Sequence, residues 1–285
     1  MKVYRNYTQE ELDTQYEHRK FVLNADEYIE RTRKESERVR AALKGTLDVR
    51  YGATKDEKLD IFPAKRAKAP VMVYIHGGRW QMQSKAAVSY PAETFVAAGV
   101  TWVSVGFRMY PHVQMDEVVR QNRAALAWVW RNAESFGGDP GRIYLSGHSS
   151  GAHLAAMLAT TDWAGDYEIP ADVLKGVTTI SGMYDLEPVR LSARNDILKL
   201  DMATALRNSP IHRLPPKGMP LIIGAGGIET DEFRRHPREF AAAWTAKGFP
   251  CQAMEFAGLN HFDTQELFNK PDGPLVKAIL AQMDK

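Results

Sequence analysis

Residues 142–158 read RIYLSGHSSGAHLAAML, and this stretch decides the fold. It opens with β-branched and apolar residues, passes through Gly147-His148-Ser149-Ser150-Gly151, and continues as a run rich in alanine and leucine. A strand that turns sharply into a helix presents the central serine hydroxyl at the tip of the turn, and flanking glycines permit that turn. We therefore interpret Ser149 as a candidate nucleophile on a strand–turn–helix unit.

Short apolar and β-branched runs recur on both sides of this unit, separated by stretches of helical length. Helical spacing is clearest from Glu117 to Glu134, where Val118, Ala125 and Val129 form one apolar column. This alternation predicts an α/β fold with a doubly wound, mostly parallel sheet. The predicted strands are 71–75, 100–105, 142–145, 176–180, 220–223 and 251–256, with 46–50 and 58–62 as an antiparallel edge.

Two regions do not follow the alternation. Residues 1–44 form a polar, helical extension, which we expect to pack on a catalytic domain of residues 45–285, with a substrate-covering lid or cap as the alternative. Residues 182–217, before the strand 220–223, are expected to form a small insertion that shapes a pocket. The apolar stripe of the extension consists of Tyr28, Ile29, Thr32, Val39 and Leu43.

The bulk composition excludes several classes of protein. The chain has 285 residues, 44% of them hydrophobic, which is enough for one large core. Its net charge of +2 and the lack of a Lys/Arg cluster argue against a nucleic-acid partner. The single cysteine, Cys251, excludes an internal disulfide framework. With no apolar leader and no stretch of about 18 apolar residues, we expect a soluble, cytoplasmic protein without a membrane partner.

A second glycine-rich segment, His76-Gly77-Gly78, follows the predicted strand 71–75. Small residues here leave backbone N–H groups free to approach a carbonyl oxygen. The helix after Ser149 would bring the N–H of Ser150 toward the same place. We assign Gly77, Gly78 and Ser150 to an oxyanion hole and interpret His76 as a residue that orients the loop.

A serine nucleophile of this type needs an acid and a base that follow it in the order serine, acid, histidine. Of the eight histidines, His261 alone lies in the loop after the last predicted strand. His18 and His112 lie too early in the chain, and the other histidines are interpreted as local or structural groups.

The acid should follow the strand 220–223, where Glu229 and Asp231 are both candidates. Asp185, after the preceding strand, would serve only if the acid had shifted position. Asp231 and Asp185 are also typical of helix N-caps. These alternatives stay open on spacing alone.

Several residues beside these loops are candidates for a substrate pocket. Trp80, Tyr184 and Phe262 would give an aromatic-tolerant wall, with simple packing of the loops as the alternative. Arg79 could bind a substrate carboxylate or form an internal ion pair. Residues 224–227, GAGG, lack the third glycine of a dinucleotide motif, and no H-E-x-x-H pair occurs, so no cofactor or metal is expected.

Four segments resemble kynurenine formamidase-type α/β-hydrolases and, more widely, hormone-sensitive-lipase-like carboxylesterases. They are HGGRW at 76–80, GHSSGAHL at 147–154, SGMYDLEP at 181–188 and NHF at 260–262. The resemblance covers most of the chain from about Leu47. In the formamidases the acid stands in an Asp/Glu-Ser-x-Glu-Phe-x-Arg context, and ETDEFRR at 229–235 puts Glu229 in that slot.

The resemblance implies a cofactor-independent serine hydrolase of small ester or amide substrates. Formamidases usually carry tyrosine before the tryptophan, where this chain has Arg79, and this departure favours a carboxylesterase. The alternative is an arylformamidase that hydrolyses N-formylkynurenine. The alternative outside the enzymes is a catalytically inactive, ligand-binding relative, but such proteins typically lose the catalytic base or acid. Both related families contain dimers, which makes a homodimer the assembly to test.

Overall fold

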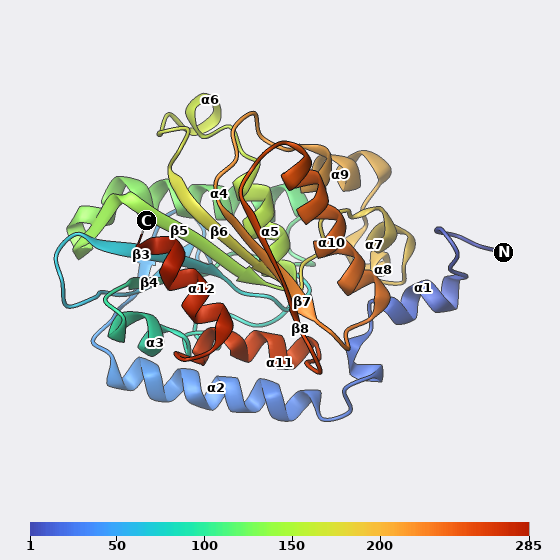
Figure 1. The fold of residues 1–285 in the computed structure, drawn as a ribbon, viewed down its shortest axis with the longest axis horizontal. Coiled ribbons are helices and arrows are strands. Elements are labelled where there is room, and N and C mark those ends of the chain that lie inside the picture. Colours follow the sequence, from blue (N-terminus) through green and yellow to red (C-terminus); the bar gives the residue numbers. More distant parts are fainter. Residues whose placement is uncertain (285) are drawn as a thin grey trace.

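An eight-stranded sheet crosses the molecule in a computed structural model that describes residues 1–284 (Figure 1). The strand order is β1-β2-β4-β3-β5-β6-β7-β8; β2 is antiparallel to β1 and β4, and the other neighbours are parallel. The strands are β1 (Thr46–Arg50), β2 (Lys58–Phe62), β3 (Ala69–Ile75), β4 (Thr101–Val105), β5 (Gly138–His148), β6 (Leu174–Ile180), β7 (Leu221–Gly226) and β8 (Cys251–Phe256). The predicted α/β class and antiparallel edge are confirmed.

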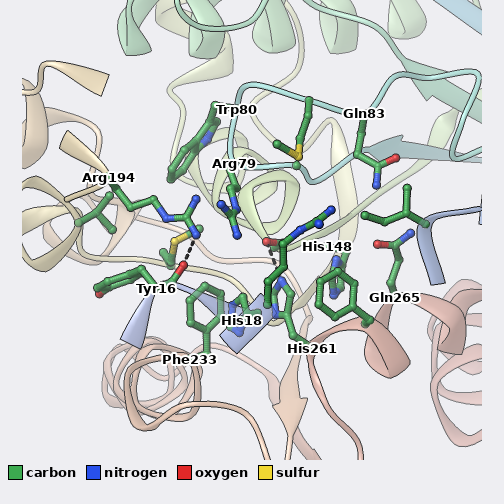
Figure 2. A pocket seen from close by; sticks show the side chains of 18 residues that line it. Tyr16, His18, Arg79, Trp80, Gln83, His148, Arg194, Phe233, His261 and Gln265 are labelled. Atoms are coloured by element: carbon green, nitrogen blue, oxygen red, sulfur yellow. Dashed lines mark hydrogen bonds between the residues drawn. The ribbon is translucent and has the colours of Figure 1, made fainter. Parts of the chain in front are cut away.

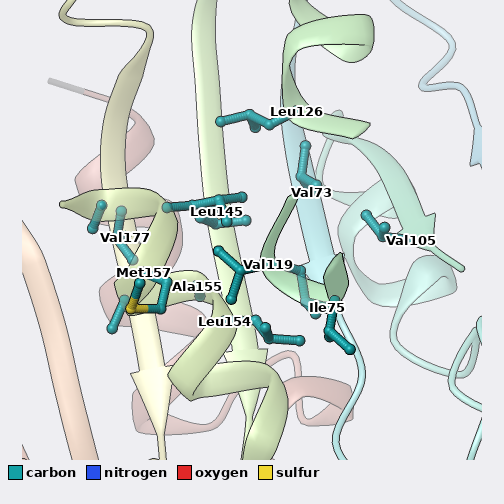
Figure 3. Close-up of a cluster of buried hydrophobic side chains, with 14 of the residues drawn as sticks. Val73, Ile75, Val105, Val119, Leu126, Leu145, Leu154, Ala155, Met157 and Val177 are labelled. Carbon is teal, nitrogen blue, oxygen red and sulfur yellow. The ribbon is translucent and has the colours of Figure 1, made fainter. Parts of the chain in front are cut away.

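The central strands are nearly continuous apolar runs because helices cover both faces of the sheet. Successive side chains of β3 alternate between two cores: Val73 belongs to one, and Met72 and Tyr74 belong to the other. Figure 3 shows part of the first core, which includes Val73, Leu145 and Leu154. β5 is longer than predicted because Gly138 also pairs with β3.

Helices occupy both sides of the sheet (Figure 1). The first core includes residues of α4, α5 and α10, and the second includes residues of α3 and α12. The helix predicted at 117–134 is α4 followed by a short 3₁₀ turn, η2. The bounds are α3 (Ala92–Ala97), α4 (Met115–Asn132), η2 (Ala133–Phe136), α5 (Ser150–Ala159), α6 (Trp163–Tyr167), α10 (Asp231–Ala246), α11 (His261–Glu266), η4 (Leu267–Asn269) and α12 (Pro274–Met283).

The N-terminal extension forms α1 (Gln9–Gln15), the 3₁₀ turn η1 (His18–Lys20) and α2 (Ala25–Ala42). Thr8 starts α1 with a capping box that includes Glu11. The extension packs on the rest of the chain at two places: α1 contacts α7 and α10, and α2 contacts α11 (Figure 1). Within the predicted stripe, Thr32 and Val39 are fully buried.

Residues 182–217 form a small helical insertion between β6 and β7, as expected. Its elements are α7 (Glu187–Leu191), α8 (Asn195–Leu198), α9 (Met202–Arg207) and η3 (Pro210–His212). Among the described residues, no helix combines the length and apolar character needed to cross a membrane.

Candidate active site

Ser149 lies on the turn between β5 and α5, as the sequence predicts. Its backbone has φ 56° and ψ −125°, a conformation that costs a non-glycine residue about 1–3 kcal/mol. The turn is anchored where the Ser149 N–H donates to the Ile180 carbonyl, 2.9 Å away. A Cβ atom on Gly147 would lie 2.3 Å from the Gly151 oxygen, and one on Gly151 would lie 2.1 Å from the Ile75 oxygen. The two glycines are therefore steric requirements of this turn.

His261 bridges Ser149 and Glu229. Its Nε2 lies 3.0 Å from Ser149 Oγ, and its Nδ1 lies 2.7 Å from Glu229 Oε2. His261 is the first residue of α11, whose N-cap Asn260 forms a capping box with Asp263. Three segments that follow β5, β7 and β8 thus meet at the carboxyl edge of the sheet, where parallel strands end together.

Of the three candidate acids, Glu229 is the one that contacts His261. Its other carboxylate oxygen accepts hydrogen bonds from Ser181 Oγ at 2.6 Å and from the Gly226 N–H at 2.7 Å. Asp231 is exposed at the start of α10 and pairs with Arg234 at 2.5 Å. Asp185 accepts from the Glu187 N–H at 3.0 Å. The structure therefore contradicts Asp231 and Asp185 as partners of His261, because each is engaged locally.

A hydroxyl chain behind the histidine was not found from the sequence. Ser181 Oγ lies 2.9 Å from Thr264 Oγ1, and Thr264 Oγ1 lies 3.1 Å from His148 Nε2. The Thr264 hydroxyl also contacts the carbonyl oxygen of His261 at 2.9 Å. These buried groups fix both Glu229 and the backbone that carries His261. Common serine and threonine residues offer no sequence signal for this role.

The segment after β3 lies against the nucleophile turn. A Cβ atom on Gly77 would approach the His148 oxygen to 2.8 Å, and Gly78 has φ +102°, with the Met82 oxygen 2.2 Å from a Cβ position. Within residues 1–284, no hydrogen-bond acceptor is recorded for the N–H groups of Gly78 and Ser150. Both groups are free to meet a negatively charged oxygen beside the N-terminus of α5.

A cavity of roughly 690 Å³, counted with its open mouth, lies over Ser149 (Figure 2). Trp80 and Phe262 line the cavity, as predicted from the sequence. The Trp80 ring is buried, and its Nε1 donates to His153 Nδ1 at 3.3 Å. The other aromatic wall residues include Tyr16 and Phe233.

The prediction for Tyr184 is wrong. Its side chain is fully buried in the core, where it stacks on Phe240 of α10 with ring centroids 4.7 Å apart. Its neighbour Met183 lines the cavity instead. Proximity in sequence to a predicted catalytic loop does not show which of two adjacent side chains faces the cavity.

Arg79 forms an internal ion pair with Glu17 of the extension, at 2.5 Å. Burial raises the pKa of Glu17, but the hydrogen bond from Arg79 and the charges of Arg79 and Arg194 outweigh it, so the pKa is lowered overall. Arg194 lies 4.0 Å from the same carboxylate and donates to the Tyr16 carbonyl oxygen. Burial, together with the charge of Arg79, lowers the pKa of Arg194 to about 10, so it stays charged at neutral pH. Two arginines thus share one carboxylate at the cavity.

His18 is the cavity residue that sequence reasoning missed most clearly. Its ring stacks on His261 with centroids 3.7 Å apart and planes inclined by 8° (Figure 2). Burial lowers the pKa of His18 well below its usual range, and the nearby His261 adds to this shift. No sequence motif surrounds His18, so only its position in the chain could indicate its role.

His18, Glu229 and His261 have possible metal-ligand atoms within 4.8 Å of one another. The two imidazole rings are stacked nearly parallel, so their in-plane lone pairs do not converge on one point. Glu229 and His261 are also bonded to each other. This arrangement does not fit a metal ion.

A mostly parallel sheet with Ser149, His261 and Glu229 joined at its carboxyl edge defines an α/β-hydrolase. The BD-FAE family model matches residues 59–189. Kynurenine formamidase of Salmo salar is 31% identical over 284 residues, which cover 95% of this chain and 94% of that protein. The chain belongs to the kynurenine formamidase family, within the wider group that includes hormone-sensitive-lipase-like esterases, and is a hydrolase.

Two further matches define its neighbourhood. The crystal structure of a candidate thioesterase from Silicibacter sp. TM1040 superimposes with a TM-score of 0.84 at 25% identity, covering 95% of this chain and 99% of that one. Esterase LipC of Mycobacterium tuberculosis is 32% identical over 150 residues, which cover 49% of this chain and 37% of that protein. Esterase-like and formamidase-like relatives therefore both occur.

Proposed function

We propose that the chain hydrolyses a small carbonyl substrate with Ser149 as nucleophile, His261 as general base and Glu229 as the group that orients His261. The observation that carries this proposal is the continuous contact from Ser149 Oγ through His261 to Glu229 Oε2. The hydroxyl proton moves to Nε2 as Oγ attacks the carbonyl carbon. Glu229 holds the Nδ1 proton and stabilises the imidazolium that results.

The tetrahedral intermediate places its oxyanion at the N–H groups of Gly77, Gly78 and Ser150. Removal of one such donor costs roughly 3 kcal/mol in another serine hydrolase. When the intermediate collapses, the imidazolium of His261 gives its proton to the departing amine or alcohol, which leaves an acyl group on Ser149. Water then attacks the acyl group as His261 takes its proton. When the carboxylic acid is released, His261 returns that proton to Ser149 Oγ. These steps use only the named groups and water.

For the substrate, we propose the formamide of an aromatic amine, with N-formylkynurenine as the first compound to test. The match to the Salmo salar kynurenine formamidase, which covers nearly the whole of both chains, supports this choice. The aromatic wall formed by Trp80, Phe233 and Phe262 suits an aromatic leaving group.

A short carboxylic ester is the second candidate. It is favoured by the local match to Esterase LipC and by Arg79, which occupies the position of the formamidase tyrosine and is paired with Glu17. Ester and formamide hydrolysis need the same three side chains. They differ in how strongly the leaving group must be protonated, because an amine leaves less readily than an alcohol.

Steady-state hydrolysis of N-formylkynurenine, p-nitrophenyl acetate and p-nitrophenyl butyrate separates the two candidates. A kcat/KM for the formamide well above that for both esters supports the first candidate, and the reverse supports the second. Ser149→Ala is the control and should remove both activities. Parent activity equal to that of Ser149→Ala on all three substrates would reject the hydrolysis proposed for them and favour a ligand-binding role.

A further inference from the structure

The N-terminal extension places an aromatic ring against the proposed base. Besides stacking on His261, His18 packs edge-on against Phe233 with centroids 4.2 Å apart and planes at 76°. The His18 residue is only 6% exposed. Its Nε2 is buried and has no hydrogen-bond partner among residues 1–284. The ring therefore makes its contacts through its face and edges, not through Nε2.

The other rings around His261 meet it differently. Phe233 lies 4.9 Å away at 79°, His148 4.8 Å away at 46°, and Phe262 5.9 Å away at 88°. Among the aromatic contacts that His261 makes with the described residues, the one with His18 is face to face. The two hydrogen bonds of His261 fix a line through its two nitrogens, but a ring can still tilt about such a line. A flat ring at 3.7 Å from one face opposes that tilt.

The charge state of His18 is compatible with such a contact. Burial is the largest cause of its lowered pKa, followed by the charges of His261, Arg194, Arg79 and His148. At neutral pH the ring is therefore uncharged. When His261 accepts the serine proton, it gains a positive charge beneath a neutral π face, which does not repel it.

The extension is anchored next to both partners of His261. Thr230, directly after Glu229, donates from its hydroxyl to the Gln15 carbonyl oxygen at 2.8 Å. Tyr28 donates to Asp263, on the first turn of the helix that starts with His261, also at 2.8 Å. These contacts bracket η1 from both sides. The position of His18 is thus fixed relative to the two segments that carry Glu229 and His261.

We infer that His18 is a positioning residue that keeps the imidazole of His261 in the plane joining Ser149 to Glu229. This inference rests on the proposed function of Ser149 and His261. It assigns the N-terminal extension a part in turnover beyond covering the substrate.

The test compares His18→Ala, His18→Phe and the parent, using whichever of the three substrates above the parent hydrolyses. Small displacements of a catalytic group cost about 10²-fold in rate, so we expect kcat of His18→Ala to fall by about 10- to 100-fold, with KM within about threefold. His18→Phe keeps a flat ring and should restore kcat to within about threefold of the parent. Lys20→Ala, on the same 3₁₀ turn but exposed and outside the cavity, is the matched control.

Thermal unfolding checks that each variant is folded. If His18→Ala does not fold, His18→Leu takes its place, because leucine fills space but cannot stack, and the same loss of kcat is expected. A kcat for Ala or Leu equal to that of Lys20→Ala would overturn the inference. A folded His18→Phe with a kcat as low as that of His18→Ala or His18→Leu would also overturn the inference, because an aromatic ring at this position would then be insufficient.

A second readout does not depend on turnover. The proton between His261 Nδ1 and Glu229 Oε2 should give a downfield, slowly exchanging proton NMR signal in the parent and in His18→Phe. The signal should broaden or vanish in His18→Ala. If no substrate is hydrolysed but this pattern holds, the proposed function fails and the positioning role stands. An unchanged signal in His18→Ala would overturn the positioning role.

Discussion

The two walls of the cavity are built in different ways. The sheet-edge wall consists of Gly78, Ser149 and His261, carried by segments that follow β3, β5 and β8, and Glu229, after β7, is bonded to His261. Its polar groups are held by buried hydrogen bonds, such as those that Glu229 accepts from Ser181 and Gly226. The extension wall consists of Tyr16, His18, Arg19 and Ile29, and Glu17 of the same segment pairs with the cavity residue Arg79. It is held by ring stacking and by a partly exposed ion pair, with side chains of Arg79 and Glu17 26% and 34% exposed.

This difference separates two kinds of contribution to function. Groups that change bonding in the transition state must be held rigidly, and buried hydrogen bonds at strand ends provide that rigidity. Partly exposed ion pairs contribute only about 0–1 kcal/mol, so they suit substrate fit better than chemistry. Changes in the sheet-edge wall should therefore lower kcat strongly, whereas changes to the Glu17 ion pair should have modest effects.

The largest effect is expected for Glu229→Gln. Glutamine keeps the shape but removes the negative charge that orients His261, and an equivalent change in another serine hydrolase lowers kcat by about 10⁴-fold. We expect a loss of about 10²- to 10⁴-fold in kcat, measured at steady state. Asp231→Asn, two residues later and paired with Arg234, should stay within about twofold of the parent. Equal losses in both variants would contradict the assignment of Glu229.

Gly78→Ala should come next. The added methyl group meets the Met82 backbone oxygen at 2.2 Å in a residue with φ +102°, so the segment that carries the proposed oxyanion donor must shift. One donor is worth roughly 10²-fold in kcat, and we expect a loss of about 10- to 100-fold.

Gly137→Ala is the matched control for this change. Gly137 also has a positive φ, +77°, but no atom lies within 4 Å of its Cβ position. It should lose about 1–2 kcal/mol of unfolding free energy through backbone strain and keep its kcat. A Gly78→Ala enzyme with the kcat of Gly137→Ala would argue against an oxyanion hole at this segment.

The sheet-edge wall could be predicted from the sequence because its signals are local. Gly147 and Gly151 are needed by a single turn, and the apolar runs of β3, β5 and β7 place the segments that follow them on one edge. Spacing alone left Glu229 and Asp231 open, since both follow β7, and the family resemblance ranked Glu229 first.

The extension wall left no such signal. His18 meets His261 only because α1 packs on α10 and α2 packs on α11, elements that lie far along the sequence. The contact between the two rings therefore depends on the complete fold. Tyr184 shows the converse error, since it lies next to Met183 in sequence but on the opposite side of the backbone from the cavity. Neither the stacking partner nor the direction of a loop side chain follows from a one-dimensional pattern.

The pH dependence of stability tests the protonation state of two buried histidines, His76 and His153. Burial lowers the pKa of His76 and of His153 to about 4, whereas unfolded histidine titrates near 6.5. Between these values the unfolded chain binds more protons than the folded chain, so stability falls as pH drops from about 6.5 toward 4. Each histidine contributes a slope of at most about 1.4 kcal/mol per pH unit.

Urea unfolding between pH 7.5 and pH 4.5 measures this dependence. His153→Gln keeps groups that can bond to Trp80 and to the Asn208 carbonyl oxygen but does not titrate. It should show a shallower loss of stability than the parent. Parallel profiles for the two proteins would contradict the neutral, buried state of His153.

The smallest effect is expected for Glu17→Gln. Loss of a partly exposed ion pair should cost less than about 1 kcal/mol of unfolding free energy. It also leaves Arg79 and Arg194 without their shared carboxylate, so KM for a substrate that bears a carboxylate should fall by a few-fold relative to a neutral ester. Comparison of N-formylkynurenine with p-nitrophenyl acetate at low and high salt measures this shift. A kcat loss as large as that of Gly78→Ala would contradict the modest role assigned to the Glu17 ion pair.

Covalent labelling shows whether Ser149 is a nucleophile that His261 activates. The folded protein is treated with a fluorophosphonate, and the modified peptide is identified by mass spectrometry. We expect one adduct per chain on Ser149, lost in Ser149→Ala and slowed at least 10²-fold in His261→Ala. An adduct on Ser150 or another serine, or equal labelling of the parent and His261→Ala, would contradict it.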